Sequence, residues 1–263
     1  MLELYHHGSS VCAAKVRMVL SEKELDWNGH YIDILKGEQF DPKYLKLNPK
    51  AVVPTLIHDG DIIRESTVIC EYLDHAFPVI PLRPAPPLEA ARMRVWTKFI
   101  DEVIHPSCAV ITFTCSHRFS MPPEEIEGFL NKTPDAGLRQ RKHEWFELGF
   151  QGPDFIKSVK AYDKLLADME TMLSDQEWLA GASFSLADIG VIPYVNRLAM
   201  LNMLDPWQPD RPLVSRWFDR MKARASFEPA INEYMPESLA NDLRTNGTAS
   251  WPEVEKVLPS SRG

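Results

Sequence analysis

Residues 78–87 contain five prolines, and this run restricts the fold of the chain more than any other feature of its sequence. Proline lacks a backbone N–H and has a fixed φ, so such a run forms neither a helix nor a central strand. We therefore interpret residues 79–88 as a linker between two domains. A chain of 263 residues is long enough for two domains with cores of their own.

The first 78 residues alternate between strand and helix patterns. An Asp-Gly pair at residues 59–60 separates two short apolar runs, which is a strong hairpin signal. The strand joined through a helix to the first strand should pair with it in parallel, and the hairpin should be antiparallel. The predicted strands and helices are residues 2–4, 11–23, 30–34, 44–47, 53–58, 62–63 and 66–77.

Beyond the linker the apolar spacing is helical throughout. The strongest helical patterns cover residues 89–104, 157–174, 186–201 and 214–225. We expect an α/β domain over residues 1–78 and an all-helical domain over residues 89–263. A polar insertion with short helices is predicted at about 116–153, and a loosely held tail from about 236.

Composition excludes several classes of protein. The net charge is −8 with no basic block, which argues against nucleic-acid binding. No run reaches the roughly 20 apolar residues of a membrane helix, and the first residues do not resemble a signal peptide. The four cysteines lack paired spacing and predict free thiols in a reducing cytoplasm. His6 and His7 are adjacent in a strand and face opposite sides, so we expect no metal site.

Ser9 and Ser10 stand where the first strand ends and the first helix begins. Free amides at a helix start favour a bound anion, and a thiolate there is stabilised. The alternative is that one serine only caps the helix. Cys12, inside the first turn, is interpreted as a small buried thiol, with a nucleophilic role as the alternative.

Three further motifs stand out in the sequence. A cis bond at Val53-Pro54 would turn backbone groups toward a ligand that adds as a strand, and an ordinary trans proline is the alternative. Glu65 and Ser66 precede another helix start, suited to an ammonium group and a carboxylate or simply to capping. Ser185 and Asp188 form a capping box, which is interpreted as purely structural.

In this order, these motifs resemble the cytosolic glutathione transferases of the serine type, with a zeta- or theta-like entry motif. The motifs are Ser-x-Cys-x-x-Lys-Val-Arg from Ser10, Asn48-Pro49 leading to Val53-Pro54, Glu65-Ser66, and Ser-Leu-Ala-Asp from Ser185. The resemblance implies a thioredoxin-like N-terminal domain, an all-α C-terminal domain and a homodimer. It also implies glutathione as co-substrate, with no metal.

The resemblance assigns roles to single residues. Ser10 matches the catalytic serine whose hydroxyl donates to the glutathione sulfur, with Ser9 as its neighbour. The residues implied to hold glutathione are Ser9, Gln39, Lys50, Val53, Pro54, Glu65 and Ser66. Many relatives carry Lys, Gln or His where this chain has Val52, and Lys50 is the nearby replacement. The expected lining of the electrophile pocket is Trp96, Ile104, Ile111, Phe113 and the aromatic residues around Trp145.

Within this family, residues 65–73, residues 93–98 and the long insert at about 122–155 resemble the bacterial β-aryl-etherase branch. The catalytic serine of that branch corresponds to Ala13 here when Lys15 is aligned. The expected function is glutathione transfer to a hydrophobic electrophile, such as an aryl ether, halide or epoxide, as in detoxification. One alternative is a non-catalytic binding or scaffold protein. The other is a glutathione-dependent thiol oxidoreductase that uses Cys12.

Overall fold

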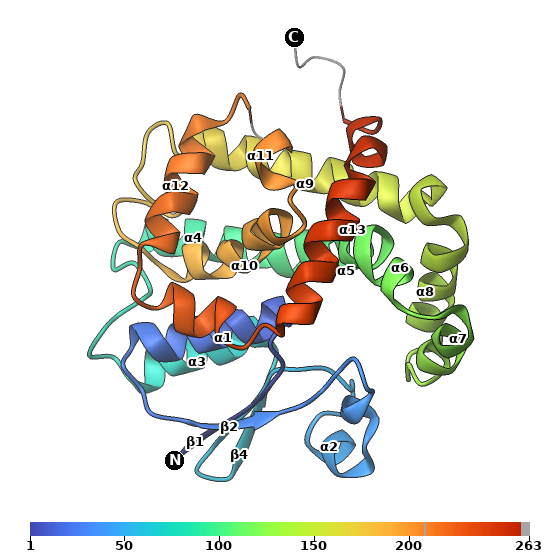
Figure 1. Cartoon of the computed structure of the whole chain (residues 1–263). Helices are drawn as coiled ribbons and strands as arrows, with labels where there is room; N and C mark the ends of the chain where they lie inside the picture. Colours follow the sequence, from blue (N-terminus) through green and yellow to red (C-terminus); the bar gives the residue numbers. More distant parts are fainter. Residues whose placement is uncertain (208, 259–263) are drawn as a thin grey trace.

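A four-stranded mixed sheet in the order β2-β1-β3-β4 forms the base of the computed structural model, which describes residues 1–207 and 209–258 (Figure 1). The strands are β1 (Leu2–His6), β2 (Asn28–Tyr31), β3 (Thr55–His58) and β4 (Asp61–Arg64). Strand β1 pairs in parallel with β2 and antiparallel with β3, and β3 forms a hairpin with β4. The predicted sheet and its strand directions are thereby confirmed.

The second strand lies earlier than the sequence pattern predicts. The prediction was residues 30–34, whereas β2 covers Asn28–Tyr31. Strand β2 is at the sheet edge, and none of its residues is buried, so apolar alternation does not mark it. The chain leaves the sheet at Asp33, whose carboxylate accepts the backbone N–H groups of Leu35 and Lys36.

Helices α1 (Val11–Glu22) and α3 (Ser66–Ala76) lie together on one face of the sheet, between it and the helical part of the molecule (Figure 1). Their apolar sides bury Val16 and Ile69 against Leu4 and Leu56 of the sheet. The short helix α2 (Pro42–Leu47) lies to one side. Both α1 and α3 begin near the end of a strand, so their N-termini open at the same edge of the domain.

All remaining described elements are helical. Two π-helical segments, Ile100–Ile104 and Phe113–His117, flank α5 and extend it at both ends. No helix among residues 1–207 and 209–258 is both long and apolar enough to span a bilayer. The helices are α4 (Pro87–Phe99), α5 (His105–Thr112), α6 (Arg118–Ser120), α7 (Pro123–Asn131), α8 (Ala136–Leu148), α9 (Pro153–Met172), α10 (Leu186–Met200), α11 (Leu204–Trp207), α12 (Pro212–Lys222) and α13 (Glu237–Glu255).

The expectation of a loosely held tail from about residue 236 is wrong for most of its length. Helix α13 occupies that region and buries Leu239, Leu243 and Val254. Leu239 and Leu243 are four residues apart, which places them on one face of the helix. The backbone of Leu201 lies so close to Gly247 that a Cβ there would meet its carbonyl oxygen at 2.1 Å. Residues 259–263 of the predicted tail lie outside the described part.

Helix α10 runs through the middle of the helical domain, and almost its whole length is buried. Its capping box is present, which confirms the structural interpretation of Ser185 and Asp188. The Asp188 carboxylate accepts the backbone N–H groups of Leu179 and Ser185 and the indole N–H of Trp217. Burial raises the pKa of Asp188 to about 6, so the carboxylate is still mainly ionised at neutral pH.

The segment before α13 packs against the strand-to-helix loop of the sheet domain. Arg17 of α1 is buried, donates from Nε to the Ala230 carbonyl at 2.7 Å, and lies over the Tyr234 ring. The Tyr234 carbonyl oxygen would be 1.7 Å from a Cβ at Gly8. Only glycine therefore fits at this position of the loop that leads to Ser9 and Ser10.

Replacing the buried carboxylate of α10 tests its structural role. We expect Asp188→Ala to lower the free energy of unfolding by about 3 kcal/mol or more, because buried donors lose their acceptor. Denaturant unfolding measures this loss. The matched control is Asp168→Ala, which removes an exposed i,i+4 ion pair with Lys164 and should change stability by less than about 1 kcal/mol. Equal losses in the two variants would contradict the prediction.

Candidate active site

A cavity of about 330 Å³ opens between the sheet domain and the helices that follow the linker. This volume lies at the lower end of the range for small-molecule sites, roughly 300–1,000 Å³. The sheet domain contributes Ser9, Ser10, Gln39 and Val53 to its wall. The helical part contributes mostly apolar and aromatic side chains, together with a few basic ones: His105, Cys108, Ala109, Thr112, Phe113, His117, Phe129, Leu130, Lys142, Trp145 and Arg197.

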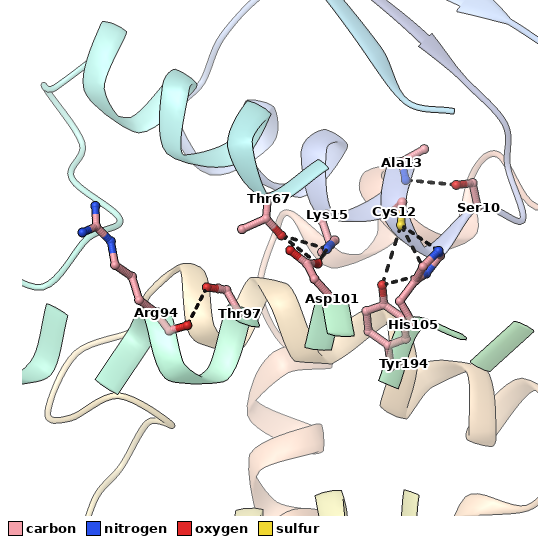
Figure 2. Close-up of polar contacts among 10 residues, drawn as sticks. All are labelled: Ser10, Cys12, Ala13, Lys15, Thr67, Arg94, Thr97, Asp101, His105 and Tyr194. Atoms are coloured by element: carbon pink, nitrogen blue, oxygen red, sulfur yellow. Dashed lines mark hydrogen bonds and ion pairs between the residues drawn. The ribbon is translucent and has the colours of Figure 1, made fainter. Parts of the chain in front are cut away.

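Ser10 is both the N-cap of α1 and a residue of the cavity wall. Its Oγ accepts the backbone N–H of Ala13 at 3.1 Å, as Figure 2 shows. A hydroxyl has one proton to donate in addition to its acceptor lone pairs. Among the described residues no group accepts that proton, so capping leaves the hydroxyl of Ser10 able to donate into the cavity.

Ser9 differs from Ser10 in this respect. Its Oγ lies 2.9 Å from Nδ1 of His7, and its backbone N–H donates to the same nitrogen at 3.1 Å. Burial and the nearby Arg17 lower the pKa of His7 to about 4, although Asp33 opposes that shift, so the imidazole is neutral at pH 7. Its Nδ1 then accepts from the Ser9 hydroxyl. The hydroxyl proton of Ser9 is therefore engaged by His7, whereas that of Ser10 is not.

The Val53-Pro54 peptide bond is cis, and Val53 lies in the cavity wall. The backbone N–H and C=O of Val53 form no hydrogen bond with any described residue. Gln39 donates its amide N–H to the Ile34 carbonyl, while its buried Oε1 has no partner in the described chain. Both residues therefore present uncommitted polar groups to the cavity. Val52 is exposed and offers only its apolar side chain.

The second helix start carries Glu65 and Ser66. Glu65 has a φ of 67°, an unfavourable conformation for a residue with a side chain. Its carboxylate forms an exposed ion pair with Lys50, at 2.7 Å. Ser66 is the first residue of α3 rather than its cap, and it is buried.

Cys12 belongs to a polar cluster that sequence reasoning underestimated (Figure 2). Its Sγ lies 3.4 Å from Nδ1 of His105 and 3.7 Å from the Tyr194 hydroxyl. Burial alone would raise the pKa of this thiol, but the positive charges of His105 and Lys15 outweigh it and lower the pKa to about 6. Its interaction with Cys12 raises the pKa of His105 in turn. The pair therefore has the character of a thiolate beside an imidazolium.

The expected electrophile lining is only partly found at the cavity. Phe113 is in its wall, whereas Trp96, Ile104 and Ile111 are buried in the hydrophobic core instead. The Trp96 indole N–H donates to the Leu179 carbonyl, which turns the side chain into the helical domain. Helical spacing shows that a helix has an apolar face, but it does not show whether that face packs in the core or lines a cavity.

The fold and the site together define a class of protein. A thioredoxin-like α/β domain with two open helix starts and unpaired backbone groups at Val53 faces an apolar cavity lined by a helical domain. Within the described residues, no group of three or more side chains is arranged to hold a metal ion. Such a site is suited to bind a small peptide-like molecule with anionic groups next to an apolar molecule.

Comparison with known proteins gives this class its family. Residues 4–86 match the family "Glutathione S-transferase, N-terminal domain", and residues 138–220 match "Glutathione S-transferase, C-terminal domain". Over 255 residues the chain is 34% identical to Protein LigF from Sphingobium sp. (strain NBRC 103272 / SYK-6), covering 92% of this chain and 96% of that protein. It is 29% identical to the tetrachloro-p-hydroquinone reductive dehalogenase of Sphingobium chlorophenolicum, covering 87% and 95%.

Solved structures agree with this assignment. The crystal structure of beta-etherase LigF from Sphingobium sp. strain SYK-6 superimposes with a TM-score of 0.77 at 32% identity, covering 87% of this chain and 98% of that one. A glutathione S-transferase from Methylobacillus flagellatus KT, solved with glutathione bound, gives a TM-score of 0.65 at 25% identity, covering 88% and 99%. The chain therefore belongs to the glutathione S-transferase family, whose members bind glutathione.

The cluster around Cys12 predicts selective alkylation. We expect iodoacetamide to modify Cys12 with a rate that rises around pH 6, where its thiolate forms, rather than near the roughly 8.5 of an ordinary thiol. Peptide mapping by mass spectrometry measures the rate at each cysteine. The three buried cysteines serve as internal controls because burial raises the pKa of Cys70, Cys108 and Cys115. His105→Asn should move the midpoint upward, and an unmoved midpoint would exclude the imidazolium as its cause.

Proposed function

We propose that this protein ionises the thiol of glutathione with Ser10 and transfers the thiolate to an electrophile in the neighbouring apolar cavity. The observation that carries the proposal is the Ser10 hydroxyl, which caps α1 and still has a proton to donate into the cavity. A hydrogen bond to a charged group contributes about 1.5–3 kcal/mol, equivalent to roughly one to two pKa units. The start of α1 adds a favourable dipole.

The remaining polar groups fit the rest of the tripeptide. The free backbone of Val53 suits an added peptide strand at the cysteinyl residue. Ser66, at the start of α3, suits the γ-glutamyl carboxylate, and Glu65 suits the ammonium group beside it. The unpartnered Oε1 of Gln39 suits a peptide N–H near the glycyl end. Lys50 is paired with Glu65 and would have to exchange that partner to reach glutathione.

The reaction proposed for this arrangement is nucleophilic displacement. The glutathione thiolate forms a carbon–sulfur bond, and the leaving group departs with the electron pair of the bond that breaks. Two relatives, a beta-etherase and a reductive dehalogenase by their names, support an aryl ether or an aryl halide as the acceptor. The serine of the etherase branch corresponds to Ala13, whose backbone N–H binds Ser10. Ether cleavage would thus depend on Ser10.

The serine pair provides the test of this proposal. Ser10→Ala should reduce the turnover of an aryl halide at saturating glutathione by at least about tenfold, with little change in glutathione affinity. Turnover is followed spectrophotometrically with 1-chloro-2,4-dinitrobenzene. Ser10→Thr keeps the hydroxyl and should retain most activity. Ser9→Ala is the matched control and should change the rate far less, because its proton already binds His7. Unchanged turnover in Ser10→Ala would refute the assignment.

Calorimetric titration with glutathione adds a second measurement of the same step. Titration in two buffers of different ionisation enthalpy reports both the affinity and the number of protons released. Ionisation of the thiol by Ser10 requires proton release near pH 7 in the native protein and a smaller release in Ser10→Ala. An absence of binding at millimolar glutathione would instead support a binding or scaffold protein on this fold.

The second candidate is glutathione-dependent thiol–disulfide exchange, and the Cys12–His105 pair favours it. The Cys12 thiolate would attack the glutathione sulfur of a mixed disulfide, forming a Cys12–glutathione disulfide and releasing the other thiol. A second glutathione thiolate would then release oxidised glutathione and restore Cys12. Cys12 is only partly exposed, so the substrate disulfide would have to reach it between α1 and α5.

Cys12→Ser distinguishes the two candidates. We expect it to abolish reduction of 2-hydroxyethyl disulfide if exchange is a real activity, and to leave conjugation of 1-chloro-2,4-dinitrobenzene largely intact. In the same assays, Ser10→Ala should lose conjugation of 1-chloro-2,4-dinitrobenzene and retain reduction of 2-hydroxyethyl disulfide. A native protein that does not reduce the disulfide would eliminate exchange, while loss of both activities in Cys12→Ser would give Cys12 a structural role.

We also propose that the protein acts as a homodimer in the cytoplasm, with residues 1–78 as the glutathione-binding domain, residues 79–88 as the linker and the rest as the electrophile-binding domain. The homodimer and the domain limits are supported by the resemblance to the family and by the proline run. The cytoplasm is supported by the four free cysteines.

A further inference from the structure

The electrophile cavity carries positive charge without matching negative charge. Its wall contains the cationic side chains Lys142 and Arg197, and none of its residues is Asp or Glu. The imidazole of His117 also lies in the wall, but burial and the nearby Arg197 lower its pKa to about 4. The imidazolium of His105, also in the wall, is paired with the Cys12 thiolate, so Lys142 and Arg197 are the charged side chains of the wall that lack an anionic partner among its residues.

Arg197 reaches the cavity from α10. Its side chain is only 4% exposed, and one of its terminal nitrogens donates to the Ser9 carbonyl. Its Nε is buried without a hydrogen-bond partner, and no carboxylate of residues 1–207 or 209–258 forms an ion pair with it. A buried cation is unfavourable unless an anion or several hydrogen bonds compensate it. Among the described residues, Arg197 has a single hydrogen-bond acceptor, the backbone carbonyl of Ser9.

Lys142 reaches the cavity from α8, in the polar insertion. Within the described part of the chain, its ammonium group has one hydrogen bond, to the hydroxyl oxygen of Thr133, at 3.2 Å. Burial lowers the pKa of this ammonium group, and no acidic group acts to restore it. Lys15 and Lys23, which are also buried, each have an aspartate partner, Asp101 and Asp74. Lys142 is thus a partly buried cation without an acidic partner among the described residues, and it can bind an anion.

We propose that the acceptor is an aromatic molecule that carries an anionic group, a carboxylate or a phenolate, and that Lys142 and Arg197 bind this group. The inference rests on the proposed transferase function and narrows its substrate class. Phe113, Phe129 and Trp145 supply apolar surface for the aromatic body. The anionic group would neutralise Lys142 and Arg197, which have no carboxylate partner among the described residues. An acceptor of this kind should be preferred over a neutral one of similar size.

Glutathione has carboxylates of its own, but the chain offers other partners for them. The start of α3 at Ser66 suits the γ-glutamyl end, and the exposed Lys50 is close to the same edge. Lys142, by contrast, is on α8 of the helical part, beside the aromatic residue Trp145. If Lys142 binds the acceptor, its loss should raise the KM for the acceptor. If Lys142 binds glutathione instead, its loss should raise the KM for glutathione.

Paired electrophiles test the inference directly. The native protein and Lys142→Gln are assayed with neutral 1-chloro-2,4-dinitrobenzene and with anionic 4-chloro-3,5-dinitrobenzoate, with each rate corrected for the uncatalysed reaction. We expect Lys142→Gln to lower kcat/KM for the benzoate by at least about tenfold, mainly through KM, because a charge-assisted hydrogen bond is lost. The rate with the neutral compound and the KM for glutathione should change little.

Two controls keep this result specific. Lys142→Arg retains the positive charge and should recover most of the benzoate activity. Lys132→Gln removes an exposed charge from the same insertion, outside the cavity wall, and should leave both substrates unaffected. Arg197→Lys provides a second variant at the other cation, with thermal unfolding as the check that it folds.

The outcomes separate this inference from the proposed function. Equal losses for both electrophiles in Lys142→Gln, or a rise in the KM for glutathione alone, would overturn the anionic acceptor and leave the transferase intact. No conjugation of either compound by the native protein would overturn the transferase itself. A selective loss for the benzoate, restored by Lys142→Arg, supports both.

Discussion

The fold depends on burying α10 along nearly its whole length, and the Asp188 carboxylate makes that burial possible. A helix start surrounded by protein leaves polar N–H groups that water cannot reach. Asp188 accepts the backbone N–H of Ser185 at this start, the backbone N–H of Leu179 and the indole N–H of Trp217, so one charged group satisfies several donors. Farther along the same helix, Tyr194 reaches Cys12 and Arg197 reaches the Ser9 carbonyl. The buried helix of the second domain thereby positions the reactive edge of the first.

One hydroxyl performs two roles at that edge. Sequence reasoning treated capping by Ser10 and a chemical role for Ser10 as competing interpretations, but the geometry makes them compatible. Accepting the Ala13 N–H fixes the orientation of the side chain and leaves its proton for a ligand. The contrast with Ser9 depends on His7, whose imidazole is kept neutral by burial and accepts the hydrogen bond from the Ser9 hydroxyl. Two adjacent, chemically identical residues thus differ because of one neighbour.

Local pattern predicted the sheet, its strand directions and most helices, because those depend on residues close together in sequence. The edge strand was misplaced because nothing buries its side chains. The polar cluster at Cys12 was undervalued because His105 is 93 positions away, and Arg197 lies 188 positions from Ser9. Such pairings are created by the packing of helices, and no periodicity encodes them. A related reason explains why the prediction of Trp96, Ile104 and Ile111 as pocket residues was wrong. The sequence pattern of an apolar helix face is the same whether that face packs against protein or against a ligand.

The close approach of Tyr234 to Gly8 also bears on how this chain can be divided. Residues 230–234 cover Arg17 and contact the loop that carries both serines. A segment from late in the sequence therefore completes part of the N-terminal domain. An excised thioredoxin-like domain would expose a buried guanidinium and lose the surface that packs against the turn carrying Ser9 and Ser10. Exchange of domains between homologues would therefore succeed only if residues 230–234 are transferred together with the first domain. The unit that folds around the two serines thus does not end at the proline linker, because it includes a segment from near the other end of the chain.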